Sequence, residues 1–216
     1  MTLALVETSA TFSPCGGYRY DLVRRWGHGP SVCWVMLNPS TATETTNDPT
    51  IRRCIDFSKR WGAGGLVVVN LYALRSTDPR GLLGGPEPTN ATNAETIRRH
   101  IAAAGVVVAA WGATWDTLGL PRCHVEMWAA DFGKEVWCLG KTKGGHPRHP
   151  LYVPRAKALE PFVAEHPDDG RCSGLSAHWC AVHGRCSCPL RFHGAMDDPG
   201  CRLHRPTAPE APSCAG

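Results

Sequence analysis

Four near-continuous apolar runs recur along the chain, and stretches of helical character separate them. The runs span residues 32–37, 66–71, 106–110 and 136–140. A strand that is buried on both faces has no polar face, so apolar runs that alternate with helices are typical of a parallel sheet covered on both sides. The sequence therefore predicts an α/β fold, a three-layer sandwich with a four-stranded parallel sheet.

Capping residues and composition place the remaining elements. Asp48 followed by Pro49 is typical of a helix N-cap with proline at the first helical position. We expect helices over 50–61, 91–104, 116–132 and 155–165, and an edge strand over 18–26 that turns back into the 32–37 strand. The composition shifts at 166–170, which predicts an α/β domain of residues 1–165 and a small Cys/His-rich tail of residues 166–216.

Composition narrows the class of protein. With 216 residues, 43% of them hydrophobic, the chain can bury one substantial core. It has no apolar run of about 18 residues and no signal-peptide pattern at its start, so we expect a cytoplasmic protein that does not bind or span a membrane. A net charge of +4 permits a nucleic-acid partner without requiring one. The sequence does not fix the oligomeric state, and we expect a monomer.

The tail holds a cluster of cysteines and histidines. Short Cys/His steps separated by about a dozen residues are typical of zinc ligands in a reducing compartment. The candidate ligands of a structural Zn²⁺ are Cys180, His183, Cys186, Cys188, Cys201 and His204. A tetrahedral site takes four of them, and our first choice is Cys180, His183, Cys201 and His204. The alternative is a disordered tail whose thiols bind metal only adventitiously.

Polar or aromatic side chains follow each of the four apolar runs. They are Asn38, Asn70, Trp111 and the pair Arg148-His149. Ligands of parallel α/β sheets bind beyond the carboxyl ends of the strands, so four segments that meet at this edge predict a binding site. The alternative for the first segment is local: Asn38 caps a turn, and Ser40 or Thr41 caps the next helix.

Several sequence blocks resemble a domain-of-unknown-function family of bacteria and phages, over about residues 18–155. The blocks are Met36-Leu37-Asn38-Pro39-Ser40-Thr41, Asp48-Pro49-Thr50-Ile51-Arg52-Arg53, Val69-Asn70-Leu71-Tyr72-Ala73-Leu74-Arg75 and Arg148-His149-Pro150-Leu151-Tyr152. This resemblance brings no known activity. The chain is also similar, more distantly, to the uracil-DNA glycosylase superfamily, whose members share a four-stranded parallel α/β sandwich and three signature segments in a fixed chain order.

The glycosylase resemblance implies roles for three of these residues. Asn38 stands in a segment similar to the motif that positions or activates water, and Asn70 matches the asparagine that reads the base edge. His149 resembles the histidine that stabilises the leaving base. The chain departs from the pattern in two places, since Met36-Leu37 replaces a preceding glycine and Leu151 replaces a serine.

Cleavage of an N-glycosidic bond requires a held water, a donor to the leaving base and a pocket for the nucleotide. Amides and imidazoles supply such donors and acceptors. The catalytic candidates are Asn38, His149 and Asp48, the last as an alternative water-activating carboxylate that is also a candidate N-cap. The candidate substrate-binding residues are Asn70, Ser40, Thr41, Arg52, Arg75, Trp111, Lys141, Lys143 and Arg148.

Some of these candidates suit contacts with phosphate, and others suit stacking on a base. Lys141 and Lys143 begin a glycine-rich loop that suits a phosphate clamp, although many such loops bind nothing. Arg52 is a candidate phosphate contact, with a solvated helix face as its alternative. The aromatic residue that stacks on a base is one of Trp111, Tyr72 and Trp115.

We therefore expect a DNA glycosylase-like hydrolase that cleaves the N-glycosidic bond of a base, modified or not. Its partner is DNA or a nucleotide, and catalysis needs no cofactor. The alternatives are a nucleotide- or nucleic-acid-binding protein without catalysis and an enzyme that acts on free modified nucleotides.

Overall fold

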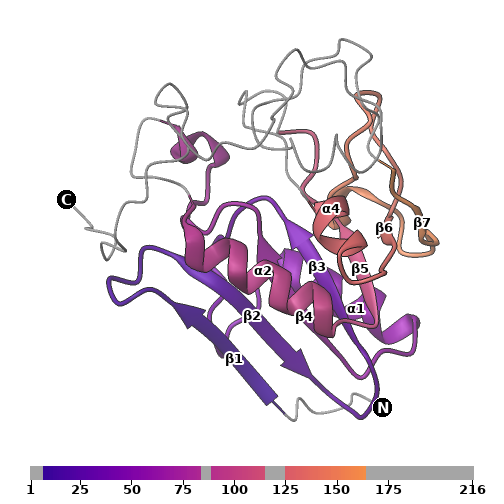
Figure 1. The fold of residues 1–216 in the computed structure, drawn as a ribbon, viewed down its shortest axis with the longest axis horizontal. Coiled ribbons are helices and arrows are strands. Elements are labelled where there is room, and N and C mark those ends of the chain that lie inside the picture. Colours follow the sequence, from indigo (N-terminus) through magenta and orange to yellow (C-terminus); the bar gives the residue numbers. More distant parts are fainter. Residues whose placement is uncertain (1–6, 84–88, 115–124, 164–216) are drawn as a thin grey trace, which may run out of the picture. The chain divides into compact units, whose positions relative to one another are not determined.

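The computed structural model describes residues 7–83, 89–114 and 125–163. The chain divides into two units, Met1–Glu165 and His166–Gly216, and the described residues belong to the first. They form a mixed α/β fold around one seven-stranded sheet with the order β1-β2-β4-β3-β5-β6-β7 (Figure 1). The strands are β1 (Glu7–Phe12), β2 (Arg19–Arg25), β3 (Ser31–Met36), β4 (Gly65–Asn70), β5 (Val106–Ala109), β6 (Val136–Cys138) and β7 (Glu160–Pro161).

The α/β class is confirmed, but the sheet is not four-stranded. Strands β4, β3, β5 and β6 are adjacent and parallel, and they coincide with the four apolar runs. Antiparallel strands extend this group on both sides, β1 and β2 next to β4 and β7 next to β6. These additions escape the apolar-run pattern because they are short or carry charged residues.

The strand β2 is not the edge strand that the sequence predicted. It pairs with β4 on one side, where Leu22 lies opposite Val68, and with β1 on the other, where Leu22 lies opposite Ala10. It forms no hairpin with β3, because β4 is inserted between the two in the sheet. A strand between two neighbours is buried, and Arg19, Asp21 and Arg24 of β2 are buried with it.

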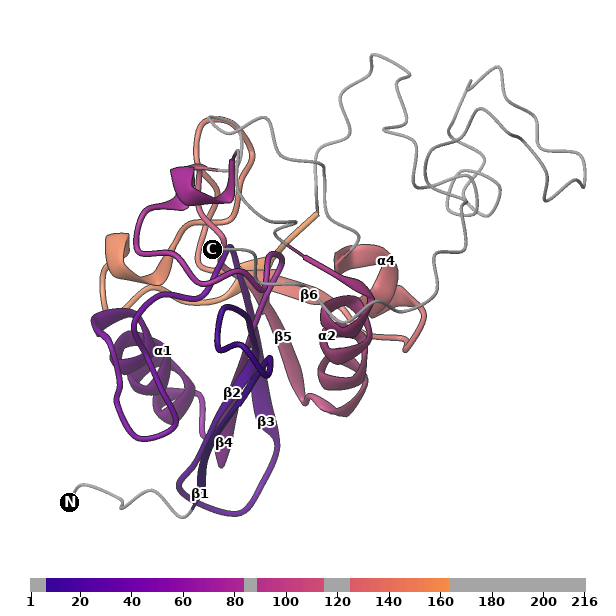
Figure 2. The same ribbon diagram turned by 90° about the vertical axis from the view of Figure 1, so that its left-hand side faces the viewer.

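Helices cover both faces of the sheet (Figure 2). The helix α1 (Pro49–Arg60) packs Ile51, Cys54 and Phe57 against one face, which includes Trp34. The helices α2 (Ala91–Ala103) and α4 (Val125–Ala130) pack on the other face. Two short 3₁₀ helices, η1 (Pro79–Leu82) and η2 (Pro150–Tyr152), lie in the loops.

The ends of the helices confirm some predictions and correct one. Asp48 caps α1, because its Oδ1 accepts a hydrogen bond of 2.8 Å from the Ile51 amide. The predicted helix at 155–165 is wrong in its described part, where β7 pairs with β6 instead. Pro161 has no amide hydrogen to continue a helix, which favours an extended strand at the sheet edge. Of the predicted helix at 116–132, residues 116–124 lie outside the described part, and α4 forms within the rest.

The tail predictions also lie outside the described residues, as do all six candidate zinc ligands. Within the described residues, no helix is long and apolar enough to cross a membrane.

Candidate functional site

A cavity of about 570 Å³ opens at the carboxyl ends of the parallel strands. Eight of the candidate residues line it: Asn38, Ser40, Asp48, Asn70, Trp111, Lys143, Arg148 and His149. They come from the ends of β3, β4 and β5, the start of α1 and the loop after β6. Residues far apart in the chain therefore meet in one concave site.

Asn38 presents an unused acceptor. Its Nδ2 donates to the carbonyl oxygens of Ser76, at 2.8 Å, and Pro39, at 3.1 Å. Both partners are acceptors, so the orientation of the amide is fixed with the nitrogen toward them. The Oδ1 atom has no hydrogen-bond donor among the described residues, which leaves it available to a water or a ligand.

Asn70 shows the opposite arrangement. The residue is only 2% exposed, and its Oδ1 accepts a hydrogen bond of 3.3 Å from Nη2 of Arg19. Because arginine only donates, Oδ1 must face it and Nδ2 must point elsewhere. Within the described part of the chain, Nδ2 has no acceptor. The backbone of Asn70 is held as well, since Nδ2 of Asn93 donates to its carbonyl oxygen at 3.0 Å.

His149 is held as a neutral imidazole. Its Nδ1 accepts a hydrogen bond of 3.3 Å from the Leu151 amide and so caps η2. A neutral ring that accepts at Nδ1 carries its proton on Nε2. Burial lowers the pKa of His149 from 6.5 to about 4, although Asp48 acts in the opposite direction. The ring is therefore uncharged at neutral pH and has one N–H to donate.

Gly112 brings the backbone close to His149. Its φ of +80° lies in the left-handed region, and a Cβ at this position would lie 3.3 Å from the Cβ of His149. Its amide donates to the Pro147 carbonyl oxygen at 2.9 Å, which ties the end of β5 to the loop that carries His149.

The helix α1 contributes to the site at two points. Asp48 caps its N-terminus and also lines the cavity, so the cap and the site roles are compatible. Further along, Arg53 donates from Nε to the Pro150 carbonyl oxygen at 3.3 Å and from Nη2 to that of Val153. Its guanidinium also lies over the Phe57 ring, 5.1 Å from the centroid. Arg53 thus anchors the His149 segment to α1.

Two buried arginines of β2 hold the loop between β3 and α1. Nη1 of Arg19 donates to the Ala42 carbonyl oxygen at 3.0 Å. Arg24 donates from Nε to Oδ1 of Asn47 at 2.9 Å and from Nη2 to the Thr43 carbonyl oxygen at 2.6 Å. Arg19 lines the cavity as well. Neither arginine was predicted from the sequence, because a charged strand shows no local sign that its residues are buried.

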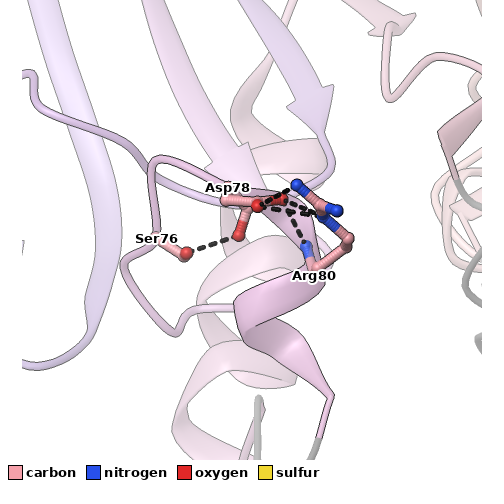
Figure 3. A network of polar contacts seen from close by, with 3 residues as sticks. All are labelled: Ser76, Asp78 and Arg80. Atoms are coloured by element: carbon pink, nitrogen blue, oxygen red, sulfur yellow. Dashed lines mark hydrogen bonds and ion pairs between the residues drawn. The ribbon is translucent and has the colours of Figure 1, made fainter.

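The loop after β4 also lines the cavity, through Ser76, Thr77 and Pro79. We call this segment the β4 loop rim, and Figure 3 shows Ser76, Asp78 and Arg80 in it. Asp78 accepts from Nε of Arg80 at 3.0 Å and from Nη2 at 2.8 Å, and Ser76 donates from Oγ to the Asp78 carbonyl oxygen. The Ser76 amide also donates to the Pro39 carbonyl oxygen at 2.9 Å. The last of these bonds, together with the bond from Nδ2 of Asn38 to the Ser76 carbonyl oxygen, joins the loop to the Asn38 segment.

Four candidates lie away from the cavity lining. Arg52 donates to the Asn47 carbonyl oxygen at 2.6 Å, Arg75 to that of Gly16 at 3.0 Å, and Lys141 to that of Val163 at 2.8 Å. Thr41 is exposed. Arg75 also lies over the Phe12 ring at 5.1 Å. These contacts support local structure, and the proposed binding roles of the four residues stay predictions.

The cavity lining includes further residues that the sequence analysis did not select. The polar or aromatic ones are Arg19, Thr50, Ser76, Thr77, Thr114, Thr142 and Tyr152. Tyr152 is 79% exposed, and its ring centroid lies 5.6 Å from that of His149. Tyr152 lies three residues after His149 in the chain, and no sequence pattern marks it as part of the site. Of the three aromatic candidates for base stacking, Trp111 lines the cavity, Tyr72 is buried in the core and Trp115 lies outside the described residues.

The charges of the lining favour an anionic ligand. Arg19, Lys143 and Arg148 are cationic, Asp48 is the carboxylate among the described lining residues, and His149 is neutral. No group of three or more potential metal ligands occurs in the described part of the chain.

Residues 19–151 match the family model described as "Protein of unknown function (DUF1643)". No curated protein and no solved structure matches the chain significantly.

Proposed function

The chain belongs to the DUF1643 family, and we propose that its cavity binds a nucleobase and hydrolyses the N-glycosidic bond of that base in DNA. The observation that supports this proposal is the complementary hydrogen-bonding state of three residues in one cavity. Asn38 has a spare acceptor, Asn70 has a spare donor and His149 has a spare N–H.

Each spare group suits one requirement of the reaction. Oδ1 of Asn38 accepts a hydrogen bond from the attacking water and orients it. Nδ2 of Asn70 donates to a carbonyl oxygen on the base edge. Nε2–H of His149 donates to the oxygen of the leaving base, where negative charge develops, without the energetic cost of burying a cation.

The step is a hydrolysis in which the water oxygen bonds to the anomeric carbon. The bond between that carbon and the base nitrogen breaks, and its electron pair goes to the base. The water loses one proton, and the base anion takes up one proton on release. Asp48 is the carboxylate in the cavity that can accept the proton of the water.

The remaining lining residues fit a nucleotide. Lys143 and Arg148 are exposed cations that suit phosphate groups, and Trp111 and Tyr152 offer aromatic surfaces. The chain order of the three residues is that of the uracil-DNA glycosylase superfamily, and its layered sandwich is part of the same proposal. We also propose a structural Zn²⁺ in the tail. The described residues do not include its candidate ligands.

A base-release assay tests the proposal. Single- and double-stranded DNA that contain uracil or other modified bases are incubated with the protein, and free base and abasic sites are measured. We expect release by the wild type and a loss of roughly 10²- to 10⁴-fold in Asn38→Ala and His149→Ala, the range for single general-acid or oxyanion contacts. Thr45→Ala is the matched control, since Thr45 lies in the same loop as Asn38 but is exposed, outside the lining and not a candidate for substrate binding.

Absence of release from every substrate would refute the catalytic proposal. Binding of nucleotides or DNA without release would then favour the non-catalytic binding protein. Release from free nucleotides alone would favour an enzyme that acts on modified nucleotides.

A further inference from the structure

Arg19 is a buried cation without a contact anion. It is 2% exposed, and none of its recorded contacts in the described part of the chain is an ion pair with a carboxylate. Its guanidinium instead donates to two neutral oxygens, the carbonyl of Ala42 and Oδ1 of Asn70. The Nε atom is buried and has no hydrogen-bond partner among residues 7–83, 89–114 and 125–163. Buried charged groups are ordinarily paired, so this arrangement is incomplete.

The electrostatics agree with that conclusion. Burial lowers the pKa of Arg19 to about 10, and Asp48 only partly opposes this effect. The guanidinium nevertheless stays charged at neutral pH. A cation that lines a cavity without a carboxylate in direct contact attracts an anionic ligand to that end of the cavity.

We propose that Arg19 and Asn70 form an anion site for the deprotonated edge of a planar base. In this site Nδ2 of Asn70 contacts an anionic oxygen of the ring, and Arg19 acts through Asn70. Donation from Arg19 to Oδ1 polarises the amide and strengthens the donor on its other side. Arg19 is therefore a positioning residue, and Asn70 touches the ligand.

This inference rests on the proposed function, because that function places a base in the cavity. It adds a second stabilising group for the base anion that forms when the glycosidic bond breaks, in addition to His149. A planar ring suits this end of the cavity better than phosphate does, since Arg19 and Asn70 are buried while the cations Lys143 and Arg148 are exposed.

A binding experiment tests the site without any need for catalysis. Calorimetric titrations compare 5-nitrouracil, whose ring is an anion at neutral pH, with uracil, which is neutral. Hydrogen bonds to charged groups are stronger than those to neutral ones, so we expect the wild type to prefer 5-nitrouracil by roughly 10- to 100-fold. Arg19→Met should lose this preference, and Arg60→Met, which removes an exposed arginine outside the cavity lining, should keep it.

Arg19 also donates a hydrogen bond to Ala42, so Arg19→Met could lose the preference because the structure is disturbed. A second variant distinguishes this effect from loss of the site. Asn70→Asp leaves Arg19 in place and gives it a carboxylate at the position of Oδ1. We expect this variant to lose the preference for the anion while its melting temperature stays equal to that of the wild type or rises.

Equal affinities for the two ligands in the wild type, or an unchanged preference in both variants, would overturn the proposal. Displacement of 5-nitrouracil by inorganic phosphate at a similar concentration would also overturn it, in favour of a phosphate site. This experiment and the base-release assay can fail separately. A preference for 5-nitrouracil without release of any base supports the anion site and refutes the hydrolase. Release of a base without that preference supports the hydrolase and refutes the anion site.

Discussion

Replacement of His149 by asparagine should remove a large part of the acid sensitivity of this fold. His149 caps η2 through Nδ1, and asparagine is a good N-cap, so His149→Asn can preserve the cap while removing the titrating ring. The substitution therefore isolates the protonation of one side chain.

The pKa of His149 fixes the direction and size of the effect. The pKa of the His149 ring is about 4 in the folded protein, whereas the ordinary pKa of histidine, which applies to the unfolded chain, is 6.5. As the pH falls below about 6.5, the unfolded chain binds a proton at this position and the folded protein does not, so the free energy of unfolding decreases until the pH reaches about 4. At about 1.4 kcal/mol for each pKa unit, the free energy of unfolding falls by at most about 3 to 4 kcal/mol. Above about pH 6.5 the ring is neutral in both states and contributes nothing to the pH dependence.

Urea unfolding at a series of pH values between about 4.5 and 7.5 measures the effect. The free energy of unfolding of the wild type should fall more steeply with acid than that of His149→Asn, and the other titrating groups cancel in the comparison. The same substitution at the exposed His28 controls for the loss of an imidazole in general. Parallel curves for the wild type and His149→Asn would refute the description of a buried neutral ring.

Two further predictions concern the supports of His149. Arg53→Met should destabilise the protein by about 1–3 kcal/mol in urea unfolding, because two charge-assisted hydrogen bonds to the η2 segment are lost. Arg52→Met, on the same helix but without those bonds, is the control, and equal losses in the two variants would contradict the anchoring role. Gly112→Ala should cost about 1–2 kcal/mol from its left-handed backbone and should also shift the NMR signals of the His149 ring, whose Cβ would lie 3.3 Å from the new methyl group. Gly133→Ala shares the positive φ without a neighbour within 4 Å, so a shift of the His149 signals in that variant would refute the contact argument.

The central strands and two helices were predictable because their signals are local. A strand buried on both faces is apolar throughout, and β4 is buried at every position. Asp48 and Pro49 mark the start of helix α1 in the sequence, and the predicted helix at 91–104 agrees closely with α2. Both signals depend only on neighbouring residues in the chain.

The pairing of β1, β2 and β7 was not predictable in the same way. The strand β2 carries Arg19, Asp21 and Arg24, which resemble the charged residues of an exposed edge. Their burial depends on partners that are far away in the chain. Arg19 donates to Ala42 and Asn70, and Oδ2 of Asp21 lies 2.9 Å from Nε2 of His100. Such pairing is a tertiary effect that strand propensity does not encode.

In the site too, the residues with local signals were predictable and those placed by long-range pairing were not. Strand ends placed Asn38, Asn70 and His149 at one edge in the prediction, and the structure has all three in one cavity. Their catalytic roles stay predictions. Arg19 was missed because its membership of the cavity follows from the position of β2 in the sheet, and Tyr152 because a single tyrosine after His149-Pro150 has no distinctive pattern.

The His149 segment and the β4 loop rim, from Ser76 to Pro79, are attached to different parts of the fold. Asp48 caps the start of α1, and Arg53 of the same helix bonds the segment that follows His149, so Asp48 and this segment are both fixed to α1. The β4 loop rim is joined to the Asn38 segment instead. Displacement of that rim during ligand entry would therefore leave the spacing of carboxylate and imidazole unchanged. In such a fold, the β4 loop rim and the α1 side of the cavity can change independently in evolution.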